Sequence, residues 1–325
     1  LSDKFGRRKI TLFSIMIFII ASLGCFFSTK FEFFIFFRLL QASIAAGFLM
    51  SRVIIRDITS ENEAASMIGY VTMGMSIIPL FAPGLGGLIQ MLLGWPSIFL
   101  IMSLLGLLLL LLVFRDLGET KIIKKNKNTK SSASFINLFW EAKFWGYSFT
   151  LAFSAGTFFS FLGGAPYVAT KVYNLNSVVS GLVMGFPAAG YFIGNYLSGR
   201  YSKFYGIDYM ALRGILLVIF GMFICLVITV FYRDTPYFFF GLCSFVGLGN
   251  GLIIPNASVG ILSVNENLSG TAGGIGNAIM IGIGAILASV TSYYLENQTS
   301  SSYLVFIMLL SGALSYTSLY IFVLR

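Results

Sequence analysis

Arg38 and Gln41 are the first residues whose types and spacing suggest chemistry. They lie three residues apart in the apolar stretch FFRLLQASIAAG, so a helix would place both side chains on one face. A guanidinium inside a membrane helix is costly unless it faces a cavity, a partner or the interior of a helix bundle. The pair therefore indicates a functional position that faces the bundle interior, a cavity or a partner. The alternative is an anchoring side chain that reaches the membrane surface near Lys30 and Glu32.

A second polar cluster is formed by the first nine residues, LSDKFGRRK, directly before the apolar run from Ile10 to Phe27. Cations at the end of a membrane helix are retained on the cytoplasmic side. Gly6 permits a tight reversal of the chain. Asp3 is suited to the N-terminus of another helix, where free amide groups favour an anion. The cations of the cluster are Lys4, Arg7, Arg8 and Lys9.

A third cluster acts through the backbone and lies in GYVTMGMSIIPLFAPGLGGLIQ. Proline removes an amide donor and bends a helix, while glycine lets a neighbouring backbone approach closely. We therefore expect a bent, closely packed helix, although proline and glycine are frequent in any membrane helix. The residues concerned are Pro79, Pro83, Gly84, Gly86 and Gly87.

The elements that position these residues are expected to be membrane helices. The chain of 325 residues is 57% hydrophobic and 10% charged, whereas soluble chains carry about 25% charged residues. Apolar runs of about 20 residues, long enough to cross a bilayer, recur along it. We predict an all-α polytopic membrane protein with ten spans, at 10–27, 33–54, 64–92, 97–114, 145–168, 177–197, 209–231, 236–256, 269–294 and 302–324.

The distribution of the 21 Lys and Arg residues predicts the orientation of these spans. With residue 1 in the cytoplasm, ten spans return Arg325 to the cytoplasm. Most of the cations then fall in inward loops, Arg52 and Arg56 among them, as the positive-inside rule requires, and Arg38 lies inside a span. The outward loops hold only Lys30, Lys171 and Arg233. The net charge of +9 therefore reflects membrane topology rather than nucleic-acid binding.

A polar stretch at 115–143 is expected to be a flexible cytoplasmic linker. It separates an N-terminal part, 1–114, with four spans from a C-terminal part, 144–325, with six. Within the second part, LSGRYSKFYG at residues 197–206 echoes the opening loop, with Gly199 in the place of Asp3. The sequence thus predicts two similar halves.

Catalytic and metal-binding patterns are missing from the predicted spans. The chain has no His, its 12 acids lie in loops or at span ends, and no catalytic constellation of a nucleophile, metal ligands or paired carboxylates is seen at membrane depth. Neither an enzyme nor a metal site is expected, and the charged rings of a channel are not seen. Candidate cavity-lining residues are Tyr167 and Asn195, and Asn195, Asn250 and Asn256 are candidate hydrogen-bonding groups within the membrane.

These motifs together resemble the major facilitator superfamily, and within it the Bcr/CflA-type multidrug efflux transporters. LSDKFGRRK resembles the loop between the second and third helices. FFRLLQA resembles the R-x-x-Q-G motif of the fourth helix, with Ala42 in place of glycine. APGLGG resembles the G-P-x-x-G-G of the antiporter motif in the fifth. Because the chain opens on Leu1, the resemblance implies two six-helix halves from which the first two helices are missing.

The resemblance also implies a function. A relative of this kind exports drugs or other small lipophilic molecules across the bacterial inner membrane by proton antiport and alternating access, as a monomer. Its partners are the substrate, protons and the bilayer, and the proton gradient replaces a cofactor. Arg38 and Gln41 then belong to a proton or substrate pathway, in which Arg38 is linked to proton transfer, and the coupling carboxylate lies on the missing first helix.

Five residues are expected, by the same resemblance, to form a conformational latch between the halves. Asp3 is expected to contact the segment that begins at Ser269, and either Arg7 or Arg8 to pair with Asp57. Gly6 completes the set. The alternatives to drug efflux are a facilitator that exports a metabolite such as a sugar or amino acid, an importer, and a non-functional truncated carrier.

Overall fold

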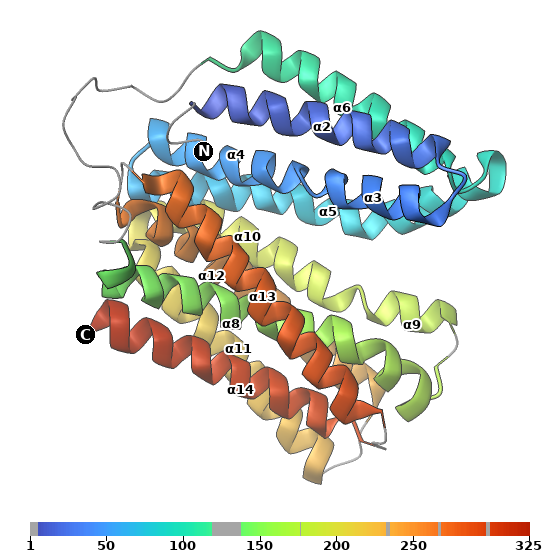
Figure 1. Cartoon of the computed structure of the whole chain (residues 1–325). Coiled ribbons are helices and arrows are strands. Elements are labelled where there is room, and N and C mark those ends of the chain that lie inside the picture. The colour runs from blue at the N-terminus through green and yellow to red at the C-terminus, as the bar shows by residue number, and fades with distance from the viewer. Residues whose placement is uncertain (1–5, 119–137, 176, 232–234, 266–267, 297–299) are drawn as a thin grey trace.

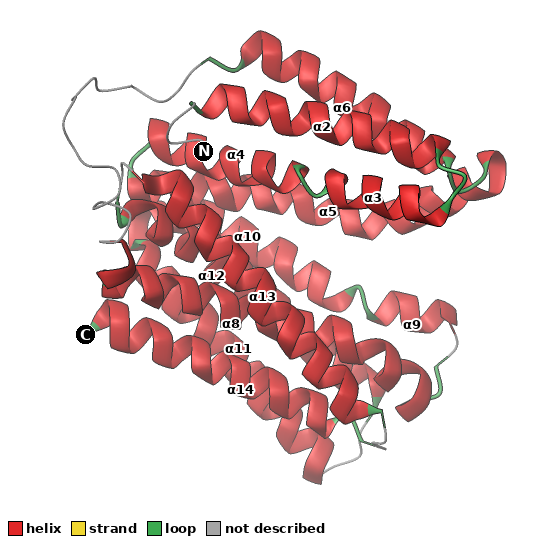
Figure 2. Ribbon diagram, in the orientation of Figure 1, coloured by secondary structure: helices red, strands yellow, loops and turns green. Residues whose placement is uncertain are grey.

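The computed structural model describes residues 6–118, 138–175, 177–231, 235–265, 268–296 and 300–325. Within these residues the chain is helical and contains no strand (Figure 2). The predicted all-helical class is therefore confirmed. Most of the predicted linker lies outside the described residues, as do Asp3 and the rest of the opening five.

The helices form two groups that lie one above the other in Figure 1. The N group consists of α2 (Arg7–Phe27), α3 (Phe31–Gln41), α4 (Ile44–Ile58), α5 (Glu61–Leu93) and α6 (Ser97–Asp116). The C group consists of α8 (Ala142–Tyr167), the π-helix η1 (Val168–Val172), α9 (Ser177–Val183), α10 (Phe186–Tyr205), α11 (Ile207–Phe231), α12 (Pro236–Ser263), α13 (Ser269–Leu295), α14 (Ser302–Leu319) and the π-helix η3 (Tyr320–Leu324).

Eight helical stretches of the described residues are long and apolar enough to cross a membrane. They are Arg7–Phe27, Phe31–Ile58, Ser97–Asp116, Ala142–Val172, Ile207–Phe231, Pro236–Ser263, Ser269–Leu295 and Ser302–Leu324. A helix suits this environment because it satisfies its own backbone hydrogen bonds where water is absent. The two other predicted spans coincide with α5 and with α9 and α10. The total of ten spans, and the two preceding helices, stay predictions.

Two predicted spans end too early. The span at 33–54 continues in α4 to Ile58, and the span at 236–256 continues in α12 to Ser263. We placed these ends at polar residues, but the structure covers those residues with neighbouring helices. Arg52 and Arg56 therefore belong to a helix and not, as predicted, to an inward loop.

The stretch that holds Arg38 is not one uniform helix. Between α3 and α4 the amides of Ala42 and Ser43 bond to the carbonyls of Leu39 and Leu40, three residues back. Such tighter, 3₁₀-type turns mark irregular points in a helix. Arg38 and Arg52 thus belong to two separate helical segments.

The long helices run from one side of the molecule to the opposite side, so their ends gather at these two sides. We call the side where α2 begins and α14 ends the basic end (left in Figure 1). It carries Arg7 and Arg56 of the N group and Arg200 and Lys203 of the C group.

Two glycines at the basic end support the predicted internal repeat. Gly6 has φ 92° and ψ 157°, and Gly206 has φ 83° and ψ 164°. Each stands directly before a helix, α2 or α11. A positive φ is readily adopted only by glycine, so both copies of the loop use the same residue for the same reversal.

Candidate functional site

A cavity of about 320 Å³ lies between the two helix groups. Its walls come from α4 and α5 of the N group and from α8, α10, α12 and α13 of the C group. The volume falls in the range of about 300 to 1,000 Å³ that is typical of sites for drug-sized ligands. The lining residues are Phe48, Arg52, Thr72, Met75, Ala155, Phe158, Phe159, Ala188, Tyr191, Gly247, Asn250, Ile254 and Met280. We call it the central cavity.

The wall of the central cavity is mainly aromatic and aliphatic, with a few fixed polar groups. Asn250 is 2% exposed. Its Oδ1 accepts a hydrogen bond from Ser154, and its Nδ2 donates to Thr157 Oγ1 at 3.1 Å. The carboxamide is therefore held in one orientation by α8. The prediction that Asn250 makes hydrogen bonds within the membrane is confirmed.

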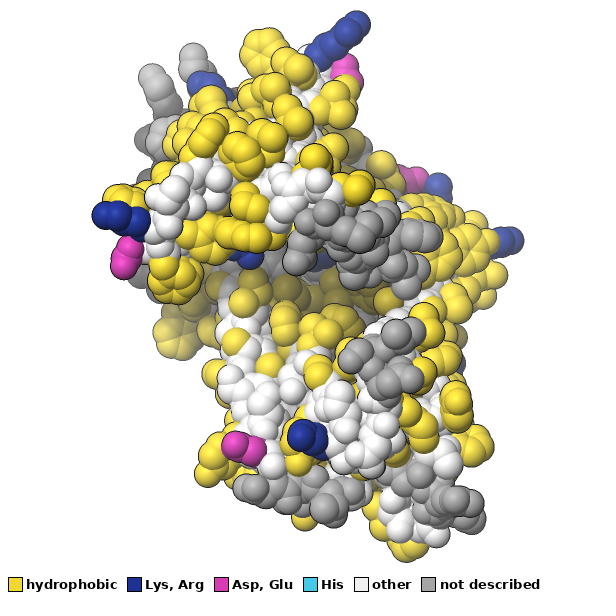
Figure 3. Space-filling view, turned by 90° about the vertical axis from the view of Figure 1, so that its right-hand side faces the viewer, with side chains coloured by type: hydrophobic (Ala, Val, Ile, Leu, Met, Phe, Trp, Pro, Cys, Tyr) yellow, Lys and Arg dark blue, Asp and Glu magenta, His cyan; other side chains and the backbone are white. Residues whose placement is uncertain are grey.

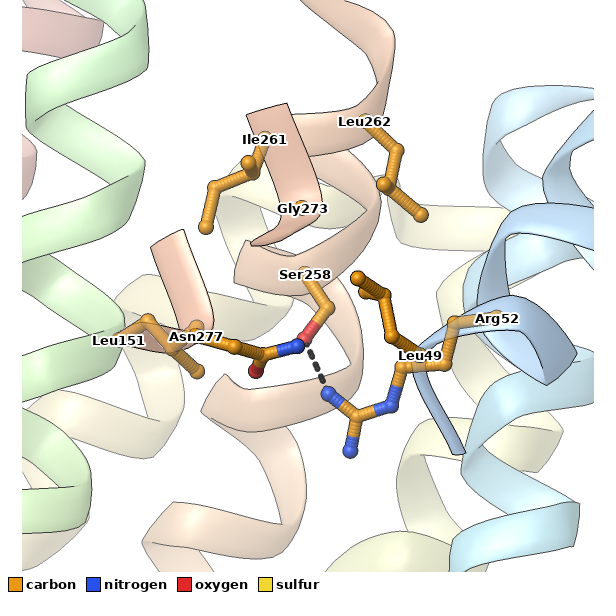
Figure 4. Close-up of a pocket in the computed structure, with 8 residues that line it drawn as sticks. All are labelled: Leu49, Arg52, Leu151, Ser258, Ile261, Leu262, Gly273 and Asn277. Atoms are coloured by element: carbon orange, nitrogen blue, oxygen red, sulfur yellow. Dashed lines mark hydrogen bonds between the residues drawn. The ribbon is translucent and has the colours of Figure 1, made fainter. Parts of the chain in front are cut away.

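Arg52 is the one charged residue among the described residues that line the central cavity. It is 6% exposed. Its Nη1 donates to Ser258 Oγ on α12 at 2.8 Å (Figure 4). Its guanidinium carbon lies 4.7 Å from the ring centre of Phe48. Beyond it, with Ser258 and Asn277, lies a second cavity of about 10 Å³, room for about one water. Arg52 thus separates the two cavities.

Arg7 joins the two helix groups at the basic end. Its side chain is 1% exposed, its Nε donates to Asp57 Oδ2 at 3.0 Å, and its Nη2 donates to Ser269 Oγ at 2.8 Å. Asp57 ends α4 in the same group, whereas Ser269 begins α13 in the other. The expected pairing with Asp57 is therefore present as a contact, and Arg7 reaches the segment that we predicted for Asp3.

Further contacts between the groups lie on the same side. Arg56 Nε donates to Ser263 Oγ at 2.8 Å, and Lys203 Nζ lies 2.9 Å from Glu63 Oε1. Together with the Arg52 and Arg7 contacts, they place arginines of the N group against serines of α12 and α13. The central cavity is therefore closed towards the basic end.

The helices α5 and α10 cross at two glycines near this closure. A Cβ on Gly69 would lie 2.6 Å from the amide nitrogen of Gly199, and a Cβ on Gly199 would lie 2.8 Å from the ring of Tyr70. Ser66 also donates to the carbonyl of Gly199. This crossing leaves no space for a side chain at position 199. It explains why the second copy of the loop has glycine where the first has Asp3.

The opposite end of the molecule is hollowed. Figure 3 faces this end and shows a recess between the upper and the lower mass of helices, with mainly hydrophobic side chains around it. The few Lys, Arg, Asp and Glu side chains of this face lie towards its rim. The molecule is thus closed at the basic end and hollowed at the other.

Arg38 and Gln41 lie apart from the central cavity. Arg38 Nη1 donates to Gln41 Oε1 at 2.8 Å, and Gln41 Nε2 donates to Ser22 Oγ at 2.8 Å. The Arg38 guanidinium carbon is 5.6 Å from the ring centre of Phe99. The predicted pair therefore exists as a contact that ties α3 to α2, with Arg38 exposed and Gln41 buried.

Arg8 differs from Arg7 in its partner. Its Nη2 donates to the carbonyl of Phe114 at 2.8 Å, and its guanidinium carbon lies 5.4 Å from the ring centre of Phe114. The cation thereby satisfies a free carbonyl near the C-terminal end of α6. Of the two arginines offered by the sequence for Asp57, the structure selects Arg7.

The proline and glycine cluster lies within α5, which is helical without interruption from Glu61 to Leu93. A Cβ on Gly86 would meet no atom within 4 Å, so the close approach expected there is absent. The close approach occurs instead at Gly69. The side chains of Pro79 and Pro83, and the surroundings of Gly84 and Gly87, lie outside the described side chains.

Two candidate lining residues do not line the central cavity. Tyr167 donates from its hydroxyl to the carbonyl of Glu296 at 3.1 Å, so it joins α8 to the end of α13. Asn195 is fully buried and donates from Nδ2 to the carbonyl of Tyr191 at 2.8 Å. Asn256 donates to Ser198 Oγ at 3.0 Å. The two amides therefore make hydrogen bonds in the bundle, as predicted, but the lining role is not supported.

Sequence reasoning missed Arg52, whose burial has one signal in the sequence. The stretch that follows it, Val53–Ile55, is apolar, so the helix continues beyond the cation. Phe48, one turn earlier, lines the same cavity. A cation flanked on both sides by apolar residues is a candidate for the bundle interior.

Comparison with known proteins gives a consistent picture. A model of the Major Facilitator Superfamily matches residues 1–289. The uncharacterized MFS-type transporter YdgK of Bacillus subtilis (strain 168) is 30% identical over 210 residues, which are 62% of this chain and 52% of that protein. The match thus spans about half the length of that relative.

Two relatives carry names that refer to resistance. The bicyclomycin resistance protein homolog of Haemophilus influenzae is 28% identical over 89% of this chain and 74% of its own length. The multidrug resistance protein MdtL of Salmonella typhi is 25% identical over 88% of this chain and 74% of its own length.

Two solved structures share the fold. The human organic anion transporter MFSD10 has a TM-score of 0.70 at 18% identity, over 97% of this chain and 78% of its own. A bacterial homologue of the iron transporter ferroportin, in an outward-facing state, has a TM-score of 0.75 at 14% identity, over 99% and 85%.

Proposed function

Because the chain belongs to the Major Facilitator Superfamily, we propose that it is a secondary active exporter of small lipophilic molecules, of the Bcr/CflA type, driven by protons that move inward. Family membership indicates a multi-pass membrane transporter rather than an enzyme. The proposal concerns the substrate class, the direction and the energy source. One observation carries it: a cavity of about 320 Å³ with aromatic and methionine walls, built by both helix groups.

The composition of the central cavity favours lipophilic ligands. Phe158 and Phe159 of α8 and Phe48 of α4 offer ring faces, while Met75 and Met280 offer flexible side chains from opposite groups. Such walls repack around ligands of different shape. The resistance-related names of the relatives from Haemophilus influenzae and Salmonella typhi favour the same class.

By the positive-inside rule, the basic end lies on the cytoplasmic side of what we propose is a bacterial inner membrane. The central cavity is then closed towards the cytoplasm and hollowed towards the outside, which corresponds to the outward-facing state of an alternating-access cycle. In this state Arg7 and Asp57 form the conformational latch. The chain reversal at Gly6 positions Arg7 at the start of α2. Transport requires that their contact with Ser269 breaks when the halves rock.

Proton coupling needs a titratable group in the transport path. Among the described residues, no Asp, Glu or Lys lines the central cavity. We assign to Arg38 the role of positioning the proton pathway through Gln41, to which it donates a hydrogen bond, and through Ser22, to which Gln41 donates in turn. Family resemblance assigns the coupling carboxylate to the first helix of the family fold.

Inverted membrane vesicles with an imposed pH gradient test this function. Addition of chloramphenicol, a neutral lipophilic drug, to vesicles that contain the protein is expected to dissipate the gradient. The variant Arg38→Ala is expected to abolish this response. The control Arg213→Ala removes an arginine whose guanidinium carbon lies 4.9 Å from the ring centre of Tyr209. This variant is expected to keep the drug-induced dissipation. Empty vesicles correct for leakage.

The outcomes separate the parts of the proposal. Dissipation that persists in Arg38→Ala reduces Arg38 to an anchor and leaves export in place. The absence of a response to chloramphenicol in the wild type contradicts proton-coupled drug export.

A further inference from the structure

We propose that Arg52 is an anion-binding group at the floor of the central cavity, so that the preferred ligand is a lipophilic molecule with one anionic group. The proposal rests on the proposed function only in that it takes the central cavity as the ligand site. It concerns a residue that neither the sequence motifs nor the latch includes.

The first argument is the lack of a compensating charge. Arg52 is 6% exposed, and its contacts are the hydroxyl of Ser258 and the ring of Phe48. No carboxylate of the described residues forms an ion pair with it. A buried charge is normally paired or surrounded by several hydrogen bonds, because its desolvation is costly. Among the described residues, Arg52 has one neutral hydrogen-bond acceptor for its five N–H donors, and its other polar neighbour, Tyr191, is also neutral, so most of that cost is uncompensated.

The second argument is direction. One terminal nitrogen points to Ser258, while the other is turned away from it (Figure 4). The same side chain lines the central cavity. The guanidinium fork therefore presents donors to a ligand in the cavity. A carboxylate or sulfonate matches such a fork in charge and in geometry.

The third argument is selectivity among lipophilic ligands. A cation in the central cavity would meet the positive charge of Arg52 in a poorly solvated space, where like charges repel strongly. The ring of Phe48, which could attract a cation, already lies against Arg52 at 4.7 Å. Phe158, Phe159 and Ile254 remain for the apolar body of the ligand. The site thus favours an aromatic anion over an aromatic cation.

Binding to the purified chain in lipid nanodiscs, without a proton gradient, tests this inference. The probes are 1-naphthalenesulfonate and its neutral counterpart 1-naphthalenesulfonamide, which have nearly the same shape. The sulfonate is expected to bind wild type more tightly than the sulfonamide. In Arg52→Met the sulfonate Kd is expected to rise roughly 10- to 100-fold, the usual effect of removing a charged hydrogen-bond partner. The sulfonamide Kd is expected to stay unchanged.

Two further variants separate binding from folding and from closure. Ser258→Ala removes the contact between the groups but keeps the charge, so sulfonate affinity is expected to be unchanged or higher. Arg213→Met removes an arginine that lies on a ring outside the cavity, and both Kd values are expected to be unchanged. If Arg52→Met does not fold, the Kd values of the two probes for wild type and for Ser258→Ala still test the inference.

Three results would overturn the inference. They are equal binding of the two probes to wild type, equal binding of the sulfonate to wild type and Arg52→Met, and a loss in Ser258→Ala as large as in Arg52→Met. Absence of sulfonate binding to wild type would overturn the inference in the same way as equal binding of the two probes. Because no gradient is present, failure here is distinct from a failure of proton-driven export, which the vesicle assay detects with chloramphenicol.

Discussion

Arg52 and Arg7 are both buried arginines, yet their surroundings give them different tasks. Arg7 has a carboxylate partner, Asp57, and a second contact across the groups at Ser269. Arg52 has a hydroxyl partner and faces the central cavity. A paired guanidinium stabilises a contact, whereas an uncompensated one favours binding of an anion. The difference lies in the neighbours and not in the residue type.

The ion pair of Glu63 and Lys203 provides a prediction at the scale of single residues. The hydrogen bonds from Lys203 and then from Ser60 hold the pKa of Glu63 below its ordinary value. A lowered pKa adds stability above the unfolded-state value of about 4.3, and this contribution is lost as the pH falls through the lower folded pKa. Wild type is therefore expected to melt slightly above Glu63→Gln at about pH 6, and the difference is expected to shrink as the pH falls below the unfolded-state value and to vanish below the lowered folded pKa.

Melting temperatures in detergent across this pH range measure the effect. The pair is exposed, so the difference is expected to shrink in about 1 M salt, where the Debye length is about 3 Å. Glu61→Gln, two residues earlier in α5, removes an acid that forms no ion pair among the described residues and serves as the control. A Glu63→Gln difference that grows towards acid would contradict the assigned direction.

The crossing of α5 and α10 provides a prediction at the scale of elements. A Cβ on Gly69 would lie 2.6 Å from the backbone of Gly199, whereas a Cβ on Gly74 would meet nothing within 4 Å. Gly69→Ala is therefore expected to destabilise the protein by about 1 to 3 kcal/mol, as overpacking does. Gly74→Ala is expected to be neutral or to stabilise by up to about 1 kcal/mol, because alanine favours a helix.

Thermal or denaturant unfolding measures the stability of the two variants. They can be compared directly because each adds one methyl group to the same helix. Equal stability of Gly69→Ala and Gly74→Ala would show that α5 and α10 do not cross as closely as the structure places them.

The rocking of the two helix groups provides a prediction at the scale of the whole molecule. Asp57→Asn removes the charge partner of Arg7, whose side chain is 1% exposed. The closed basic end is expected to lose about 1 to 3 kcal/mol, a shift of roughly 5- to 150-fold in the ratio of closed to open molecules. Spin labels at Lys9→Cys on α2 and Phe204→Cys on α10 are then expected to move apart, because the groups separate on this side.

Pulsed electron paramagnetic resonance measures the distance between these labels. The native cysteines, Cys25, Cys225 and Cys243, are buried and interfere little. Glu32→Gln, an acid in the first turn of α3 at the opposite end, is the control and is expected to leave the distances unchanged. An unchanged distribution in Asp57→Asn would remove the latch from the mechanism.

Much of the architecture was determined by the sequence alone, because membrane helices are set by local hydrophobicity over about 20 residues. The all-helical class and the positions of most helices follow from this, and so does the reversal at Gly6, which depends on backbone freedom at one residue. The contact of Arg38 with Gln41 was also predictable, because both residues lie on one helix face. The pairing of Asp57 with either Arg7 or Arg8 was expected by family resemblance, and the structure selected Arg7.

Only the tertiary structure decided which polar residues face the central cavity. Arg52 and Ser258 are 206 residues apart in the chain, and their contact depends on how the two helix groups pack. The close approach at Gly69 rather than Gly86, and the placement of Tyr167 and Asn195 away from the cavity, have the same origin. A helical pattern specifies which residues share a face, but not which neighbour covers that face, because this depends on packing between segments distant in sequence.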